Sequence, residues 1–153
     1  MALRIATVLA VLLTALALVP AGAHLLSLPN KINLPSDQYF VAQSVYRGWA
    51  WLGAVLIVAI IADLAAGLIA REHRQRAGSA FAAAILLVLS AMIFFLWTYP
   101  TNHATENWTI LPDNWRDLRA QWEYSHAVNA AVVFAALCAI TIFAIGRRTP
   151  RTA

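Results

Sequence analysis

Three histidines lie at the ends of apolar stretches that would meet at one end of a helical bundle. His24 follows the first stretch, His103 follows the third, and His126 lies near the start of the fourth. Histidine exchanges protons near neutral pH and is the commonest metal ligand in proteins. For any one of them, an ordinary interfacial histidine that is wet or hydrogen-bonded is the favoured interpretation.

His126 is the histidine for which a function is favoured. It lies inside the apolar boundary, with Arg119, Glu123 and Asn129 close by in the sequence. Ionisable groups within a membrane are costly and usually face the bundle interior or a cavity. Arg119, Trp122 and His126 recur at three- and four-residue spacing and therefore share one helix face, with Glu123 at its edge. The residues expected close to His126 are Arg119, Trp122 and either His24 or Asn102.

The histidines do not have the spacing of a metal site. Glu123-Tyr-Ser-His126 is a single Glu-x-x-His element, whereas a di-iron bundle needs two such elements and two further glutamates. We therefore expect neither a metal nor a cofactor. A haem held between His24 and His126 in a four-helix bundle is the least favoured alternative.

The aromatic residues are strongly one-sided. All six tryptophans and all four tyrosines fall at or beyond the end that carries the three histidines. Trp and Tyr collect at membrane interfaces whatever the function, but such belts normally form at both faces. Trp108, Trp115 and Trp122 could therefore line a pocket for a planar ligand or act as interface anchors, and both interpretations stay open.

The elements that must position these residues are membrane helices. The chain has 153 residues, of which 61% are hydrophobic and 12% charged. Each of four apolar stretches is long enough for a helix to cross about 30 Å of hydrocarbon. They cover residues 5–23, 48–70, 78–99 and 127–146. We predict an all-α integral membrane protein, a four-helix bundle that forms a single domain over residues 1–153.

The basic residues predict how the bundle is oriented. Seven arginines lie at the end without tryptophan, against four basic residues at the other end, which is net acidic. The positive-inside rule then makes both termini cytoplasmic, as in a bacterial inner-membrane protein. Ala21-Gly22-Ala23 also resembles a signal-peptidase site, so a cleaved first segment is the less favoured alternative. The charge pattern does not indicate nucleic-acid binding, since no basic-aromatic motif is present.

Two helices are expected to continue beyond the membrane on the outer side. Ser36 or Asp37 is a plausible cap for the second helix, which meets its first weak points at Gly48 and Gly53. The fourth helix is expected to begin near Asn114, since neither proline nor glycine follows until Gly146. These extensions should pack together through the apolar faces around Tyr39, Phe40, Trp115 and Leu118.

Asp63 is the one charged residue inside the second apolar stretch. An intramembrane carboxyl could relay protons in a transporter. The favoured interpretation is a protonated carboxyl that is hydrogen-bonded to a hydroxyl and helps to hold the bundle together. The candidate hydroxyl partners are those of Thr14, Ser90 and Thr141.

The segment 100–126 resembles a known family. It contains Pro100-Thr-Asn102, Asn107-Trp108, Leu118-Arg119 and Trp122, followed by His126. This pattern is similar to that of a family of small four-helix membrane proteins that includes the anthrone oxygenases of polyketide pathways. Those enzymes convert an activated phenolic ring system into a quinone with dioxygen, without metal or flavin.

The resemblance implies a site at the outer face. Such a reaction needs a base, donors that hold an oxyanion, and an apolar pocket. His126 would be the base, Arg119 and Asn102 would hold the oxyanion, and the ring would lie among Trp108, Trp115, Trp122, His24 and Glu123. The expected partners are membrane lipid and an aromatic or quinone small molecule. A non-catalytic membrane subunit or lipid-binding protein is the alternative.

Overall fold

The structure, a computed structural model, describes residues 1–146. All regular secondary structure in this range is helical, and turns and one longer loop connect the helices. No strand occurs in that range. This confirms the all-α prediction. The helices are α1 (Ala2–Lys31), α2 (Ser36–Ser44), η1 (Trp49–Trp51), α3 (Leu52–Ile69), α4 (Arg74–Ile93), the π-helical η2 (Phe94–Thr98), α5 (Tyr99–Ala104) and α6 (Trp115–Ile145).

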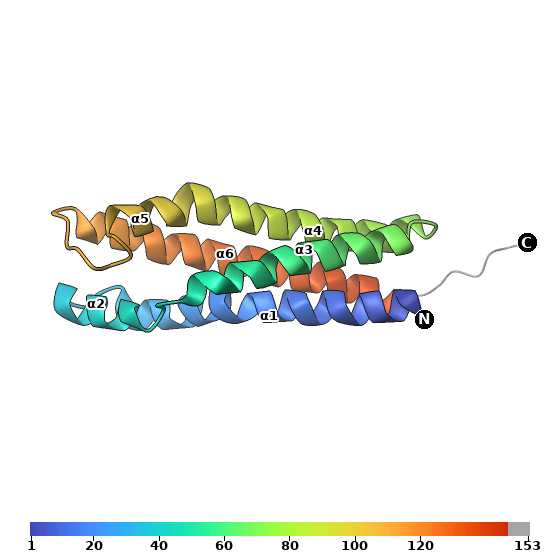
Figure 1. Ribbon diagram of the computed structural model, residues 1–153, viewed down its shortest axis with the longest axis horizontal. Helices are drawn as coiled ribbons and strands as arrows, with labels where there is room; N and C mark the ends of the chain where they lie inside the picture. The colour runs from blue at the N-terminus through green and yellow to red at the C-terminus, as the bar shows by residue number, and fades with distance from the viewer. Residues whose placement is uncertain (147–153) are drawn as a thin grey trace, which may run out of the picture.

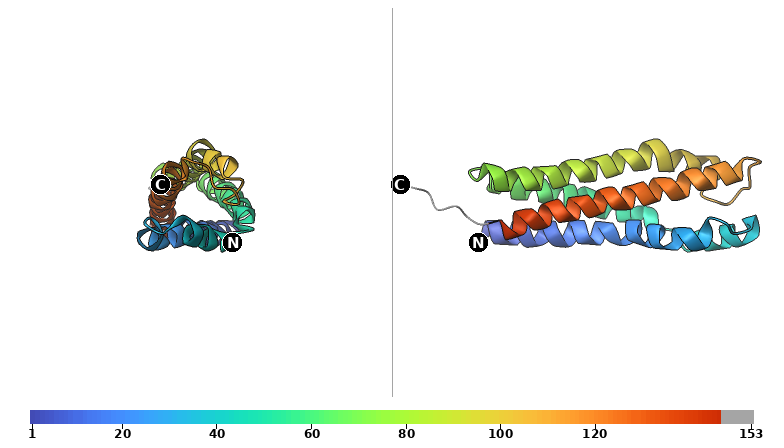
Figure 2. Two further views of the ribbon diagram at one scale, coloured as in Figure 1. Left: turned by 90° about the vertical axis from the view of Figure 1, so that its left-hand side faces the viewer. Right: turned by 180° about the vertical axis from the view of Figure 1, so that it is seen from behind.

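Within residues 1–146, four helical rods are long and apolar enough to cross a membrane, as predicted for an integral membrane protein. They comprise Ala2–Lys31, Trp49–Ile69, Arg74–Ala104 and Trp115–Ile145. Helix α1 packs against α3 and α6, and α4 packs against the same two helices, so the four rods form a closed ring. Figure 1 shows the rods side by side along the long axis, and the end-on view in Figure 2 shows the ring.

The two ends of the bundle differ in composition. We call the end that holds α2, α5 and the loop 105–114 the aromatic end, and the opposite end, with the start of α1 and the α3–α4 turn, the arginine end (Figure 1). Arg71, Arg74 and Arg76 lie at or beside that turn. Three further arginines of the predicted basic side, Arg147, Arg148 and Arg151, lie outside the described residues.

Small residues fill the core toward the arginine end. Ala10, Ala66, Ala70, Ala80 and Ala83 are buried there together with Ile140 and Phe143. Small side chains let membrane helices approach closely, which is how such helices gain packing energy without a hydrophobic driving force between them. Gly67 on α3 shows the same close approach, since a Cβ at this position would lie 2.8 Å from a ring carbon of Phe81 on α4.

Asp63 is fully buried in this part of the bundle. The Thr14 hydroxyl on α1 lies 3.3 Å from each of its carboxyl oxygens. Of the other candidate partners, Thr141 is exposed and bonds the Leu137 carbonyl, while Ser90 is buried. The α1–α3 contact through Thr14 and Asp63 fits the interpretation as a hydrogen-bonded carboxyl that joins two helices.

The outer extensions follow the prediction only in part. Helix α6 begins at Trp115 with Asn114 as its cap residue, as expected. The second extension is a separate helix, because the chain leaves the helical path after Ser44 and Gly48 takes a left-handed φ of 89°. The predicted side-chain cap is wrong, since Pro35 occupies the cap position of α2. The predicted packing between the two extensions is confirmed, because one apolar cluster contains Tyr39, Phe40, Trp115 and Leu118.

Helix α1 extends further than its apolar stretch. It continues through Pro20 and Pro29 and ends at Lys31, a turn or two beyond the expected end of the first helix. Pro is tolerated in membrane helices because neighbouring groups satisfy the freed carbonyls. The extension brings His24 and Lys31 to the aromatic end on one continuous helix.

Candidate functional site

Two of the three histidines meet inside the bundle. The imidazole rings of His24 on α1 and His126 on α6 are stacked, with centroids 4.0 Å apart and an interplanar angle of 28°. The Trp122 ring lies 4.2 Å from His126 and 4.9 Å from His24. The Tyr46 ring lies 4.2 Å from His24. The predicted proximity of His126 to Trp122 and His24 is therefore confirmed.

A buried ion pair lies beside the histidines. Lys31 Nζ, at the end of α1, lies 3.0 Å from Oε1 of Glu123 on α6, and the two side chains are 6% and 0% exposed. The Lys31 ammonium also lies over two rings, 4.6 Å from the centroid of Tyr46 and 4.9 Å from that of Trp122. A buried cation is tolerated only when it is paired, and aromatic faces add to that stabilisation.

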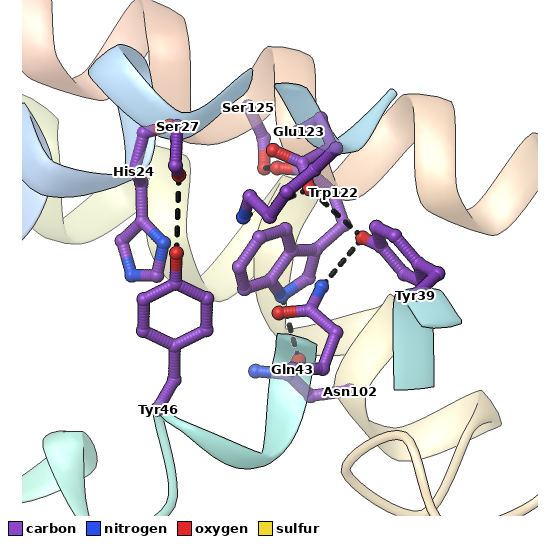
Figure 3. A network of polar contacts seen from close by, with 10 residues as sticks. His24, Ser27, Tyr39, Gln43, Tyr46, Asn102, Trp122, Glu123 and Ser125 are labelled. Atoms are coloured by element: carbon purple, nitrogen blue, oxygen red, sulfur yellow. Dashed lines mark hydrogen bonds and ion pairs between the residues drawn. The ribbon is translucent and has the colours of Figure 1, made fainter. Parts of the chain in front are cut away.

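Glu123 also anchors α2 to the bundle. The Tyr39 hydroxyl donates to Glu123 Oε1 over 3.0 Å, and Gln43 Nε2 donates to the Tyr39 oxygen (Figure 3). Burial, followed by the negative charge of Glu123, raises the pKa of the Tyr39 phenol above its usual value, so the phenol keeps its proton. Glu123, which the sequence places at the edge of the His126 face, is thus the centre of the polar cluster.

Arg119 does not lie beside His126, and that prediction is wrong. Its Nη1 donates to the Leu34 carbonyl over 2.7 Å, and its guanidinium lies over the Tyr39 and Trp115 rings. Residues seven apart on a helix share a face but are separated by about 10 Å along the axis. Arg119 and His126 do share a helix face, but Arg119 lies with the aromatic cluster of Tyr39 and Trp115, nearer the start of α6 than His126.

Asn102 reaches the site through Trp122. Its Oδ1 accepts a hydrogen bond of 2.8 Å from the Trp122 indole (Figure 3). Asn102 and the exposed His103 also line a surface hollow of about 300 Å³ beside Tyr99, Glu106 and Asn107. Trp122 therefore lies between this hollow and the histidine pair, and His103 is separated from the other two histidines.

Trp108 and Trp115 belong to the aromatic cluster around Tyr39. Both are buried in one cluster with Tyr39 and Trp122. Trp108 lies at the end of a left-handed turn, in which Glu106, Asn107 and Trp108 have φ values of 45°, 56° and 64°. Such backbone is costly for a bulky residue. Thr105 offsets part of that cost, since its Oγ1 accepts the Trp108 N–H over 3.1 Å.

Several buried polar atoms at this end have no hydrogen-bond partner in the described part of the chain. Such groups are rare in folded proteins and point to a bound water, ion or ligand. Donors and acceptors are both represented. The atoms are His24 Nδ1, Lys31 Nζ, Gln43 Oε1, Trp108 Nε1, Arg119 Nε, Glu123 Oε2 and Asn129 Oδ1.

The geometry does not match a metal or haem centre. No group of three His, Cys, Asp or Glu side chains converges on a point within residues 1–146. Axial haem ligands approach the iron from opposite sides, whereas the rings of His24 and His126 are stacked at 4.0 Å with no room for a macrocycle between them. The donor set therefore does not fit the haem alternative.

Sequence reasoning missed Lys31, Tyr39, Gln43 and Tyr46 as site residues. Lys31 is the only lysine of the chain and lies seven residues after His24, so the two share a helix face. That spacing was a usable signal, but it depended on α1 continuing through Pro29. Tyr39, Gln43 and Tyr46 carried no comparable signal, because the folding back of α2 brings them to the site.

Comparison with known proteins adds no assignment. Neither a scan against protein-family models, nor a search of curated proteins, nor a search of solved structures finds a match.

Proposed function

We propose that the aromatic end is the catalytic site of a cofactor-independent oxidation of a membrane-soluble aromatic or quinol, as in the anthrone oxygenases that the sequence resembles. The observation that carries this proposal is the stacked pair of His24 and His126, enclosed by Trp122 and Tyr46. Two imidazolium rings at 4.0 Å would repel each other, which favours a neutral ring that can act as a base.

The reaction begins with proton removal. His126 takes a proton from the activated ring carbon of the substrate and leaves an electron-rich carbanion whose charge is delocalised onto oxygen. That anion reduces dioxygen, and oxidation of a ring methylene to a carbonyl consumes one dioxygen and releases one water. Trp122 supports an apolar ring at the site, and Asn102 orients the Trp122 indole through its 2.8 Å hydrogen bond. Arg119 has no role in holding the oxyanion in this scheme.

Oxygen uptake tests the proposal. Purified protein in lipid nanodiscs is mixed with an anthrone or a quinol, and dioxygen consumption is followed with an electrode. His126→Ala is expected to remove the activity while the protein still inserts and folds. His73→Ala, in the α3–α4 turn, is expected to retain it. Equal activity in both variants, or none in the wild type with either substrate class, would reject the proposal.

A second candidate is a non-catalytic membrane subunit or lipid-binding protein. The observation that favours it is the tight ring packing, since Tyr46, Trp49 and Trp122 all lie within 5.7 Å of His24. Mass spectrometry of the purified protein distinguishes the two candidates. A co-purified quinone or phenol supports the enzyme, and phospholipid alone in inactive protein supports the second candidate.

We also propose that both termini face the cytoplasm of a bacterial cell, with the aromatic end outside. The support is the collection of arginines at one end. Reporter fusions in the α3–α4 turn and after Ala153 are expected to read cytoplasmic. A periplasmic reading at either point would overturn this orientation, as would a mature N-terminus at His24.

A further inference from the structure

Lys31 is the buried cation nearest the histidine pair. Its side chain is 6% exposed, and its ammonium lies over the Tyr46 and Trp122 rings, which also contact the histidines. Arg119 points toward Leu34 instead. The basic group available to a substrate beside the histidines is therefore the lysine.

The Lys31 ammonium has spare donor capacity. It lies 3.0 Å from Glu123 Oε1, which takes up one direction of the ammonium, and no second acceptor is paired with it among the described residues. The other carboxylate oxygen, Oε2, has no hydrogen-bond partner. An ammonium carries three N–H donors. Leaving buried N–H donors without acceptors costs free energy, so this position favours a ligand that brings an oxygen acceptor.

The surroundings of the ammonium select for an aromatic ligand. The faces of Tyr46 and Trp122 flank Nζ at 4.6 and 4.9 Å. Trp122 belongs to α6, whereas Tyr46 lies in the turn between α2 and η1, where its hydroxyl is tied to α1 through a 3.0 Å hydrogen bond with Ser27 Oγ. The Tyr46 and Trp122 ring centroids are 5.9 Å apart, so a flat ligand ring would pack against these faces only with Tyr46 turned aside. In that position the ligand would place its oxygen on Lys31 and a ring hydrogen toward the imidazoles.

We propose that Lys31 is the anion-binding group of the aromatic end, and that the ligand is an aromatic with an ionisable hydroxyl, bound as its oxyanion. Glu123 positions the ammonium, and the ligand ring packs against the aromatic side chains of Tyr46 and Trp122. This inference rests on the proposed function for its catalytic meaning, since a phenolate or enolate is the electron-rich species that dioxygen oxidises. Binding of the oxyanion itself does not require turnover.

A coloured phenol tests the inference without turnover. Para-nitrophenol absorbs differently as phenol and as phenolate, so its ionisation can be followed in the presence of purified protein in nanodiscs. The wild type is expected to bind the phenolate and to lower the apparent pKa of the probe. Lys31→Met should weaken phenolate binding by about tenfold, the loss of one charge-assisted hydrogen bond. Lys31→Arg should restore part of it.

Matched variants keep the result interpretable. Arg47→Met removes an exposed basic residue of the same end and should leave the probe spectrum unchanged. Lys31→Met combined with Glu123→Gln removes both buried charges, so it guards against misfolding caused by an unpaired carboxylate. Circular dichroism confirms the folding of each variant.

The outcomes separate this inference from the proposed function. If the protein binds phenolate through Lys31 but consumes no dioxygen, the anion site is supported and the proposed oxidation is rejected. Probe binding as neutral phenol, or a spectrum unchanged by Lys31→Met in folded protein, overturns the anion site.

Discussion

The two halves of the bundle use opposite means to join the same four helices. Toward the arginine end, the core is built from alanines, and Asp63 is bonded to Thr14. Toward the aromatic end, the core contains stacked rings and the Lys31–Glu123 ion pair. The seven buried side-chain polar atoms of the described residues that have no hydrogen-bond partner all lie there, including the ion-paired Lys31 Nζ. In the first half, close packing of small residues holds the helices together. In the second half, buried donors and acceptors remain without hydrogen-bond partners.

This difference indicates where function resides. A chain needs only small residues and hydroxyls to bring membrane helices together, as the arginine half demonstrates. Burying ionisable groups costs desolvation free energy, and a buried ion pair often stabilises a protein less than apolar side chains of equal volume would. Their concentration at one end is thus better explained by binding or chemistry than by stability, and the following variants test that contrast.

The largest effect is expected at Glu123. Glu123→Ala leaves the Lys31 ammonium buried without its counter-ion and frees the Tyr39 hydroxyl, so we expect a loss of about 3–5 kcal/mol in unfolding free energy. Thermal unfolding in detergent measures it. Asp113→Ala, at an exposed position of the same end, is the control and should change little. A Glu123→Ala protein as stable as the control would show that the ion pair is not structural.

A smaller loss is expected at Asp63. Asp63→Ala leaves the buried Thr14 hydroxyl without an acceptor, which costs about 1–3 kcal/mol. Asp63→Asn keeps an acceptor oxygen in place and should stay close to the wild type in thermal unfolding. If Asp63→Asn instead abolished oxygen uptake without loss of stability, the arginine half would have a chemical role and the contrast between the halves would fail.

The close approach of α3 and α4 gives a third test. Gly67→Ala introduces a Cβ that must displace the Phe81 ring, so we expect destabilisation by about 1 kcal/mol. Gly53→Ala has open space around its Cβ and serves as the matched helical glycine. Equal unfolding temperatures for the two variants would mean that the Phe81 ring yields freely and that the helices are not tightly packed there.

The smallest effect concerns alkaline pH. The pKa of Tyr39 is raised in the folded protein, so above pH 10 the unfolded chain has lost a phenol proton that the folded protein keeps. Stability should therefore fall as pH rises through this range, and Tyr39→Phe should remove part of that fall. Unfolding at pH 8 and pH 11 measures the difference. An identical alkaline loss in Tyr46→Phe and Tyr39→Phe would contradict the assignment to Tyr39.

The sequence alone determined the class and layout of the protein. Four apolar stretches of membrane length can satisfy their backbone only as helices, which is why the four-helix membrane bundle could be inferred from composition. The start of α6 followed from Asn114 and the absence of breakers, and the proximity of His126 to Trp122 followed from helical spacing. These are local or periodic properties that a helix transmits directly.

Tertiary structure decided which polar residues meet. The stacking of His24 on His126 and the pairing of Lys31 with Glu123 join α1 to α6, residues about 100 apart in the chain, and no periodicity specifies such a contact. The turn at Gly48 brings Tyr46 and Tyr39 against them. Arg119 shows the limit most clearly, because a shared helix face fixes direction but leaves about 10 Å of axial separation from His126.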